Sequence, residues 1–303
     1  MPHWLLKSFI QRAISVLPRP QKWNELLQKH VTKSLGLTEP HCAGMIANAR
    51  RHLDVRWRRS LTDNFTVFEI GTGWYPVAPV VAILCGAEKV WTFDIDPLLS
   101  AERLERMLAH LRRFAADGRL VEMLPKLQKD RLAVLDAPTG SDPVARLLEM
   151  GIEYRLQDAS ATGLPDGAVD HFLSHSVMQY IPRAPLETLM REFLRIAKPK
   201  ATHSHHILLK DQFSIFDRSI SEFDFMRFSD GAWRWLDSPL IPQTRLRIRD
   251  YREAFVAAGW KLLAEHSEDG NAAALKRVKL DPRFRDYSEA ELLVVSTWVE
   301  LGN

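Results

Sequence analysis

Short apolar runs alternate along the chain with longer segments in which apolar residues recur at helical spacing. Residues 65–70 form a β-branched and aromatic run behind the turn residues 62–64, which predicts a first strand. Residues 71–75 then predict a loop, and the small and apolar residues 76–84 predict a helix that closes at Gly86. The main body of the chain is therefore expected to begin as strand, loop and helix.

The same alternation continues toward the C-terminus. Apolar runs predict further strands over residues 90–93, 152–156, 171–174, 203–209, 260–265 and 292–299. Helical spacing predicts helices over residues 40–59, 98–116, 143–150, 185–197 and 250–259. Because strands alternate with helices, we expect an α/β fold with a doubly wound, mostly parallel sheet covered by helices on both faces.

Two segments lie outside this alternation. Residues 1–60 predict an N-terminal helical extension, and residues 61–303 predict the main domain. Within that domain, an aromatic-rich stretch at about 213–245 follows neither period and predicts an insertion over one end of the sheet. We expect its aromatic side chains to form a small core; the alternative is a lid that excludes water from a reaction.

The first segment also bears on where the protein works. Residues 4–17 form a basic amphipathic stretch, which either packs its apolar face on the domain, as we expect, or contacts a membrane surface or directs import into an organelle. No apolar stretch reaches the ~18 residues that span a bilayer.

Cys42 and Cys85 have no metal-ligand spacing and are expected to be reduced thiols. We therefore expect a cytoplasmic protein.

Composition adds little to this picture. Of the 303 residues, 46% are hydrophobic and 26% are charged, which suits a packed core with a solvated surface. The formal net charge is only +3, and basic residues are scattered apart from a group at 50–59. We therefore expect no nucleic-acid partner.

Candidate chemistry begins at the end of the first predicted strand, because ligands of a doubly wound sheet bind beyond the carboxyl ends of its strands. Gly71 and Gly73 allow a tight turn and a close approach of the backbone to a ligand. Asp94 stands 21 residues after Gly73, at the end of the second strand, where a carboxylate can accept hydrogen bonds from both hydroxyls of a ribose. Dinucleotide sites and adenosylmethionine sites share this arrangement.

Three features separate these two kinds of site. The third glycine of a dinucleotide G-x-G-x-x-G motif is replaced by Pro76, which hinders the close helix start that a pyrophosphate uses. Glu69 precedes the first glycine and can meet a cationic group of a ligand. Asp158 supplies a further acid at the end of the third strand. An NAD(P)-dependent oxidoreductase is therefore the less favoured interpretation.

The motifs and their order resemble the class I S-adenosylmethionine-dependent methyltransferase family. The first motif resembles residues 69–73, the second residues 93–96, and the third Asp158-Ala159. Two more segments match the pattern of the family, namely residues 164–170 and 194–199. The resemblance implies a Rossmann-like sheet of seven strands with the last strand antiparallel, and S-adenosylmethionine as the cofactor.

The resemblance also implies a role for each motif residue. The implied cofactor-binding residues are Glu69, Gly71, Thr72, Gly73, Asp94, Ile95, Asp158, Ala159 and Ser174. Glu69 and the glycine-loop backbone hold the methionine part, and Asp94 binds the ribose hydroxyls. Ile95, Asp158 and Ala159 contact the adenine, and Ser174 lines the path to the methyl group.

No catalytic base is fixed by the sequence. His175 has the best position, because the fourth strand is expected to end at the methyl group and imidazole titrates near neutral pH. His205 and Tyr180 follow, and the alternative that none of the three is a base stays open. His203 and His205 share one strand face, but no carboxylate or cysteine joins them at ligand spacing, so we expect no metal site.

A smaller resemblance concerns the methyl acceptor. It is to a subgroup linked to bacterial sugar and polysaccharide biosynthesis, and the matching residues are 204–207, 210–213, 245–247 and 250–251. The sequence departs from the family pattern at Trp74-Tyr75-Pro76 and at Lys200-Ala201, so the shapes of these two loops are not predicted. We expect methyl transfer to an oxygen or nitrogen of a small molecule or glycan precursor. A non-catalytic interaction protein on a methyltransferase scaffold is the stronger alternative.

Overall fold

The computed structural model describes residues 12, 36–59, 64–136, 140–215, 217–238 and 242–303. The predicted amphipathic stretch at 4–17 lies, apart from Arg12, outside the described residues, as does most of the N-terminal extension. No helix within the described ranges is long and apolar enough to cross a membrane.

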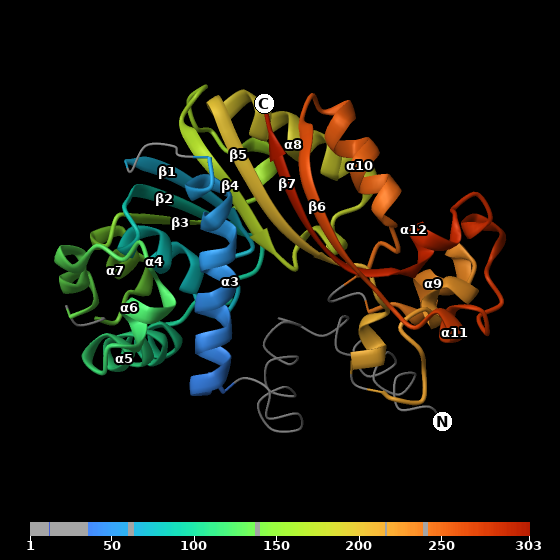
Figure 1. Cartoon of the computed structure of the whole chain (residues 1–303), viewed down its shortest axis with the longest axis horizontal. Helices are drawn as coiled ribbons and strands as arrows, with labels where there is room; N and C mark the ends of the chain where they lie inside the picture. The colour runs from blue at the N-terminus through green and yellow to red at the C-terminus, as the bar shows by residue number, and fades with distance from the viewer. Residues whose placement is uncertain (1–11, 13–35, 60–63, 137–139, 216, 239–241) are drawn as a thin grey trace.

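A single sheet of seven strands forms the centre of the molecule (Figure 1). Its strands are β1 Phe65–Ile70, β2 Ala87–Asp94, β3 Ile152–Leu156, β4 Val169–His175, β5 Ala197–Leu208, β6 Lys261–Asp269 and β7 Val294–Gly302. The order is β3-β2-β1-β4-β5-β7-β6, and β7 runs antiparallel to both of its neighbours while the other pairs are parallel. This confirms the predicted doubly wound sheet of seven strands with an antiparallel last strand.

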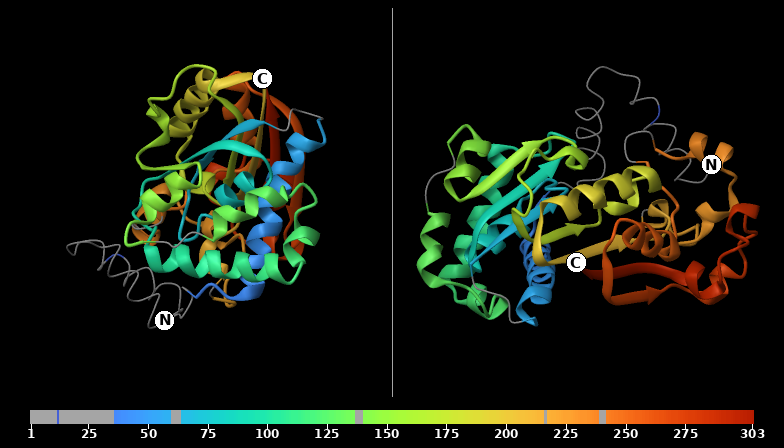
Figure 2. Two further views of the ribbon diagram at one scale, coloured as in Figure 1. Left: turned by 90° about the vertical axis from the view of Figure 1, so that its left-hand side faces the viewer. Right: turned by 90° about the horizontal axis from the view of Figure 1, so that it is seen from above.

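Helices cover both faces of this sheet (Figures 1 and 2). The α-helices are α3 Glu39–Trp57, α4 Val77–Leu84, α5 Ala101–Ala116, α6 Arg119–Met123, α7 Pro143–Glu149, α8 Arg183–Ile196, α9 Asp230–Leu236, α10 Ile248–Ala257, α11 Ala272–Leu275 and α12 Glu289–Leu293. Short 3-10 turns include η3 Ala159–Ala161, η4 Met178–Tyr180, η5 Gln212–Ile215 and η6 Asp224–Arg227. One hydrophobic core lies between the sheet and α3, α4 and α5, and a second lies between the sheet and α8 and α10.

The first strand explains why two cores form. Phe65 and Val67 belong to the core under α3 to α5, whereas Phe68 and Ile70 belong to the core under α8 and α10. Successive side chains of a strand point to opposite faces, so a strand buried on both faces needs apolar residues at nearly every position. Four of the six residues at 65–70 are apolar, and they lie on both faces of the strand.

Several boundaries differ from the prediction, because pairing across the sheet extends the strands into less apolar sequence. Ala87 already pairs with Phe65, so β2 begins three residues before the predicted start. The polar residues at the end of β6 pair with β7, which carries that strand to Asp269. Residues 289–293 are helical, not part of the last strand, because Ser288 and Glu291 form a capping box at the start of α12.

The predicted aromatic insertion is part of a third, smaller core. The described residues of 212–245 pack there against residues 271–293, which the sequence did not associate with them. We call these two segments together the accessory subdomain. The buried side chains of this core are Phe213, Phe223, Phe225, Met226, Trp233, Leu275, Phe284, Leu292 and Val295. Figure 1 shows α9, α11 and α12 gathered at the side of the molecule away from α5, α6 and α7.

One buried arginine joins this subdomain to the sheet. Arg247 is fully buried, and its guanidinium donates hydrogen bonds to the main-chain oxygens of Leu209, Leu292 and Val294. These three carbonyls lie just beyond β5, within α12 and at the start of β7. The accessory subdomain is therefore held at the carboxyl end of β5, the edge where a doubly wound sheet binds its ligands.

Candidate cofactor site and active site

The glycine loop after β1 requires two glycines for different reasons. Both have positive φ, 81° at Gly71 and 66° at Gly73, a region that L side chains rarely adopt. A Cβ on Gly71 would lie 2.2 Å from Cγ2 of Val177, so the loop packs there against the segment after β4. A Cβ on Gly73 would meet no atom within 4 Å, which leaves open space in front of this part of the loop.

Asp94 fixes the loop to the tip of β2. Its carboxylate accepts the N–H of Gly73 at 2.8 Å and the N–H of Asp96 at 3.0 Å. Burial raises the pKa of Asp94, and the main-chain N–H donors oppose that rise. Each carboxylate oxygen can accept a second hydrogen bond, so the group keeps the capacity to bind hydroxyls.

Glu69 is a buried carboxyl that lacks a cation. Only 5% of its surface is exposed, and its carboxylate accepts a hydrogen bond from the Thr92 hydroxyl, which also contacts the Thr72 hydroxyl. Burial raises the pKa of Glu69 to about 8, because the charged form loses its hydration. Within the described part of the chain it forms no ion pair. A cationic ligand group beside it would supply the missing charge.

Apolar and acidic side chains stand exposed at the ends of β2 and β3. Ile95 is 75% exposed and Leu156 is 54% exposed, although both are large hydrophobic residues. Gln157 donates its N–H to the main-chain oxygen of Asp94 at 2.9 Å, which joins the two strand ends. Asp158 is exposed and accepts the N–H of Ser160, whereas Ala159 is buried. The implied adenine contacts Ile95 and Asp158 are therefore both at the surface of this edge.

Ser174 and His205 are paired with each other inside the sheet. They stand opposite one another in register, and Ser174 Oγ lies 2.9 Å from Nδ1 of His205. Nε2 of His205 lies 2.9 Å from Nδ1 of His203. Both Ser174 and His205 are fully buried, and burial lowers the pKa of His205 to about 3. This geometry argues against His205 as a base and against Ser174 as a lining of the methyl path, because both side chains are fully buried and each is paired with the other.

His175 lies at the carboxyl end of β4 and is only partly buried. Its Nδ1 is 3.3 Å from Nε2 of His52, its Nε2 is 3.2 Å from the Asn48 amide nitrogen, and its ring stacks on that of His206 at 4.4 Å. Burial, with the nearby Arg51 cation, lowers the pKa of His175 to about 4. The imidazole is therefore neutral at pH 7 but a weak base.

Tyr180 connects the sheet edge to the accessory subdomain. It lies in η4, and its hydroxyl is 2.8 Å from the amide nitrogen of Gln212 in η5. Burial raises the pKa of Tyr180, and the carboxylate of Asp237 raises it further. Burial also raises the pKa of Asp237 to about 7. Sequence reasoning missed Asp237 and named Gln212 only within the sugar-related resemblance, because only the folded chain brings these two residues close to Tyr180 at the end of β4.

His52 and Asn48 were missed for a similar reason. They lie on α3, and nothing in the spacing of that helix indicates that it crosses the ends of β4 and β5. His52 also lies 2.9 Å from Ser204 Oγ on β5. Within the ranges that the structure describes, no three His, Cys, Asp or Glu side chains are grouped so that they could hold a metal ion.

Residues 115–203, less than a third of the chain, match the family model described as a methyltransferase domain. The sheet order and the antiparallel β7 are those typical of Rossmann-like methyltransferases. Over that segment the chain resembles a methyltransferase domain, and its sheet has the Rossmann-like methyltransferase order. A comparison with curated proteins gave no match.

Solved structures with similar folds are distant in sequence. A methyltransferase from Methanosarcina mazei is 12% identical with a TM-score of 0.45, and the alignment covers 82% of this chain and 96% of that protein. One from Mesorhizobium loti is 14% identical with a TM-score of 0.44, covering 82% and 98%. At these values the likeness carries no argument about substrate.

Proposed function

We propose that this methyltransferase domain transfers the methyl group of S-adenosylmethionine to an oxygen or nitrogen of a small molecule or glycan precursor. One observation carries the proposal: the buried acid Glu69 and the acid Asp94 flank an open glycine loop, and Glu69 has no cation among the described residues. A ligand with a cationic group and a ribose matches both acids.

Each part of the cofactor has a matching group on the chain. Glu69 and the backbone of residues 71–73 would hold the methionine part, and Asp94 would accept hydrogen bonds from the ribose hydroxyls. The exposed Ile95 would pack on the adenine, with Asp158 and Ala159 at its polar edge. When bound, S-adenosylmethionine supplies an electrophilic methyl group on a sulfonium.

The residues of the chain contribute orientation and charge. Glu69, whose pKa is raised to about 8, would ionise beside a cationic amine, because the opposite charge favours the carboxylate. Its burial makes that attraction stronger than it would be in water. Holding the acceptor atom in line with the methyl carbon can supply much of the rate without a strong base.

The acceptor proton has few possible recipients at this edge. Neutral His175 has a suitable position but a pKa of only about 4. Asp237, near Tyr180, has a pKa of about 7 and is better matched to neutral pH. We infer that Asp237 and Tyr180 border the acceptor and that His175 holds the end of β4 in place through its ring contacts.

The side-chain contacts of the matching residues give little support to the sugar-related resemblance. Ser204 contacts His52, and His206 contacts the hydroxyls of Ser176 and Ser296 at 3.0 Å each. These side chains join elements of the sheet instead of facing an acceptor. A glycan precursor therefore stays one class among the acceptors to be tested.

Calorimetric titration with S-adenosylmethionine and its demethylated product tests the cofactor site. We expect Asp94→Ala to weaken binding at least about tenfold, because it removes charge-assisted hydrogen bonds to the ribose. Asp117→Ala, a change at an exposed carboxylate at the end of α5, is the control and should bind like the wild type. A folded wild-type preparation that binds neither compound would refute the proposal.

One observation favours a non-catalytic scaffold. Of the two histidines that the sequence offers as bases, His175 has a low pKa, and His205 has a low pKa and is also fully buried. Such a protein would bind the cofactor without turnover, or not at all. Release of the demethylated product in the presence of pooled acceptors, abolished in Asp94→Ala, would exclude it.

For the nicotinamide alternative, a fluorescence titration with NADH should show no binding, since Pro76 at the start of α4 offers no N–H to a phosphate.

A further inference from the structure

The chain leaves β4 through a strained turn. Ser176, the first residue after β4, has a φ of 57°, in the left-handed region that residues with a Cβ rarely adopt. Glycine is the usual residue in such a conformation, because it has no Cβ and meets no steric penalty there. Backbone strain of this kind persists only where the surrounding structure holds the residue in place. The contacts that hold Ser176 therefore bear on the site beside it.

His206 on β5 holds Ser176 in this conformation. The N–H of Ser176 donates to the main-chain oxygen of His206 at 2.9 Å, and the Ser176 hydroxyl lies 3.0 Å from Nδ1 of the same residue. The other ring nitrogen, Nε2, lies 3.0 Å from the hydroxyl of Ser296 on β7. Burial lowers the pKa of His206 to about 3, so the neutral imidazole can donate from one nitrogen and accept at the other. His206 thus ties the turn to both β5 and β7.

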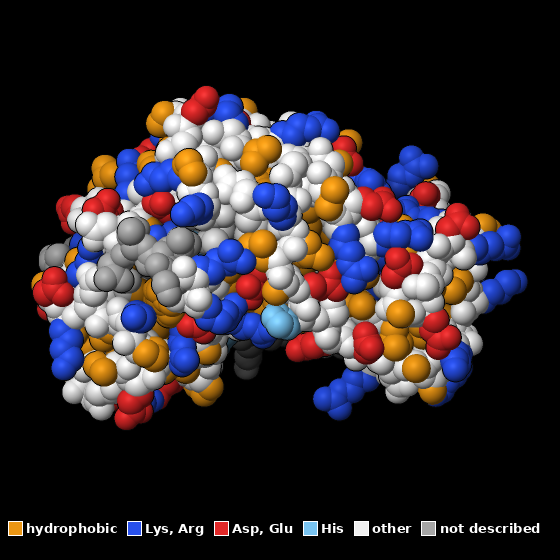
Figure 3. Space-filling model, turned by 45° about the horizontal axis from the view of Figure 1, so that its top comes forward, with side chains coloured by type: hydrophobic (Ala, Val, Ile, Leu, Met, Phe, Trp, Pro, Cys, Tyr) orange, Lys and Arg blue, Asp and Glu red, His pale blue; other side chains and the backbone are white. Residues whose placement is uncertain are grey.

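The strand end before the turn is held as well. His175 pairs with His206 in the sheet register, and their rings stack at 4.4 Å. The two ring nitrogens of His175 contact His52 and Asn48 of α3, at 3.3 and 3.2 Å. Histidine side chains show little surface on the face drawn in Figure 3, where basic and acidic side chains are spread widely. The end of β4 is therefore fixed by internal contacts from α3 and β5.

The residue after the turn packs against the glycine loop. A Cβ on Gly71 would lie 2.2 Å from Cγ2 and 3.3 Å from Cβ of Val177, so the Val177 side chain lies directly against the backbone of Gly71. Two residues further along the loop, Gly73 donates its N–H to Asp94 and has open space in front of it. The direction in which Ser176 sends the chain therefore decides how Val177 meets the loop.

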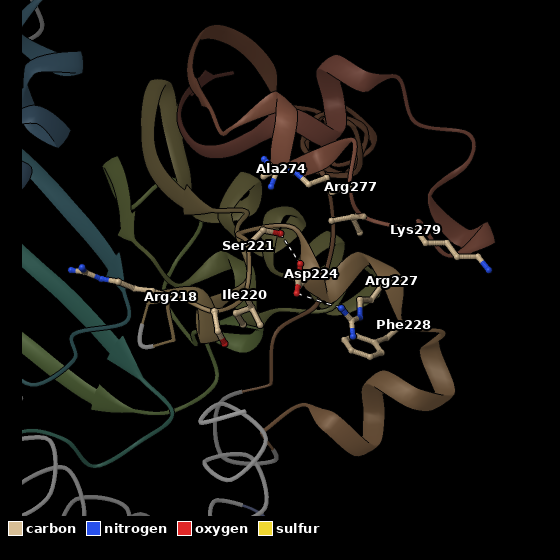
Figure 4. A pocket seen from close by; sticks show the side chains of 11 residues that line it. Arg218, Ile220, Ser221, Asp224, Arg227, Phe228, Ala274, Arg277 and Lys279 are labelled. Atoms are coloured by element: carbon tan, nitrogen blue, oxygen red, sulfur yellow. Dashed lines mark hydrogen bonds and ion pairs between the residues drawn. The ribbon is translucent and has the colours of Figure 1, made fainter. Parts of the chain in front are cut away.

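A cavity in the accessory subdomain has no such convergence of side chains. Residues 218–228 and 274–279 line it. Figure 4 shows Arg218 and Lys279 extending from opposite ends of this cavity. These side chains point apart, whereas the contacts at the end of β4 meet at the single residue Ser176. The turn after β4 is therefore the feature with a consequence for ligand binding.

We propose that Ser176 is a positioning residue for the cofactor site: held in its left-handed conformation by His206, it places Val177 against Gly71 and so sets the shape of the glycine loop. The part of this inference that concerns cofactor binding rests on the function proposed above. Ser176 touches no ligand in this role. It acts through the backbone of the next residue, so a change at Ser176 alters binding only when it alters the turn.

Calorimetric titration of three variants with S-adenosylmethionine tests this role. Ser176→Val should weaken binding about tenfold, because a β-branched residue is disfavoured in the left-handed region. Ser176→Gly should bind within about twofold of the wild type, since glycine adopts the same conformation without that penalty. The matched control is Lys200→Val: Lys200 is exposed near the start of β5, away from the loop, and its φ is 65°. This control should lose stability but bind normally, and equal affinities of the two valine variants would overturn the proposal.

A second pair of variants keeps the test decisive should Ser176→Val not fold. His206→Phe keeps a ring that can stack on His175 but cannot contact the Ser176 hydroxyl through a nitrogen, so it should weaken binding of S-adenosylmethionine several-fold. In a Ser176→Gly background the same change should have no further effect on binding, because the hydroxyl is already absent and glycine needs no support. Thermal midpoints show that each protein is folded. Losses of affinity that are independent of the residue at 176 would contradict the role of His206.

A measurement without ligand separates this inference from the proposed function. Nuclear Overhauser contacts between the methyl protons of Val177 and the α protons of Gly71 should be present in the wild type and in Ser176→Gly, and lost in Ser176→Val. A wild type that shows these contacts but does not bind S-adenosylmethionine would support the placement and refute the proposed function. Contacts that are absent from the wild type, or that persist unchanged in Ser176→Val, would overturn the placement itself.

Discussion

At the scale of single residues, the glycine loop is shaped by two different requirements. Gly71 is needed because Val177 occupies the space where a side chain would begin, whereas Gly73 leaves its space open. Glu69 stands beneath this loop as a buried acid whose pKa is raised to about 8. The protonation of Glu69 is therefore the property of the site that responds most directly to a cationic ligand.

We predict that Glu69 releases a proton when S-adenosylmethionine binds. At pH 7 the carboxyl is mostly protonated in the free protein, and a cation beside it lowers its pKa. Calorimetry in buffers of different ionisation enthalpy should show that the wild type releases close to one proton more than Glu69→Gln. Equal proton release by both proteins would contradict the role given to Glu69.

The substitution Glu69→Gln also affects stability. Measuring the stability of the variant provides the control for its cofactor binding. Because the folded-state pKa lies above the unfolded value of 4.5, the folded chain keeps a proton that the unfolded chain loses. The contribution of Glu69 to the free energy of unfolding therefore decreases as pH rises from 4.5 to about 8. Glu69→Gln should be at least as stable as the wild type at pH 8, so weaker cofactor binding by this variant would not be due to unfolding.

At the scale of elements, β4 and β5 carry a set of buried and half-buried histidines. Burial lowers the pKa of His171, His205 and His206 to about 3 and that of His175 to about 4. Serine and threonine hydroxyls contact three of them: Thr202 lies 2.8 Å from His171, Ser174 lies 2.9 Å from His205, and two serines contact His206. These histidines act as neutral polar residues that join neighbouring strands and α3.

We predict that stability falls steeply below pH 6.5. The folded-state pKa values lie below the unfolded value, so the stability these groups contribute is present above pH 6.5 and is lost as pH falls toward 3–4. Each fully buried histidine adds up to about 1.4 kcal/mol per pH unit to this loss. Urea unfolding at pH 7.5, 6.0 and 5.0 measures the slope.

The matched variant for this prediction is His171→Gln, which keeps a polar group near Thr202 but cannot titrate in this range. Its stability should depend less steeply on pH than that of the wild type between pH 6.5 and 5. A slope identical to that of the wild type would show that His171 is not among the groups that control acid unfolding.

At the scale of the whole molecule, the buried cation Arg247 helps to attach the accessory subdomain to the sheet. Arg247 donates hydrogen bonds to three main-chain oxygens from two separate stretches of chain, one just beyond β5 and one where α12 meets β7. Burial lowers the pKa of Arg247 to about 10, so the guanidinium remains charged at neutral pH. Its loss would leave several buried acceptors without donors.

We predict that Arg247→Ala destabilises the protein by about 3 kcal/mol or more, because each unsatisfied buried carbonyl costs roughly 1–3 kcal/mol. Chemical denaturation measures the change, with Arg191→Ala as the exposed control expected to stay within about 0.5 kcal/mol of the wild type. The subdomain should also become more sensitive to limited proteolysis. Unchanged stability would contradict the anchoring role.

The sequence by itself determined the local features that depend on neighbours along the chain. The apolar run at 65–70, the glycines after it and the acid at 94 fixed a strand, a turn and a second strand end, because strand and turn preferences act over a few residues. The alternation of these elements predicted a doubly wound, mostly parallel sheet, and the family resemblance of its motifs added the antiparallel last strand. Strand ends were less predictable, since pairing with a neighbour carried β2 and β6 into polar sequence.

Only the tertiary structure decided which of the candidate side chains are buried and which lie at the open edge of the sheet. Ser174 and His205 stand at suitable places in the sequence, but sheet register pairs them with each other inside the fold. His52 and Asp237 come from segments far from β4 in the chain, which hydrophobic burial brings to it without leaving a periodic signal. Local pattern decides the elements, whereas burial and register over long separations decide the site.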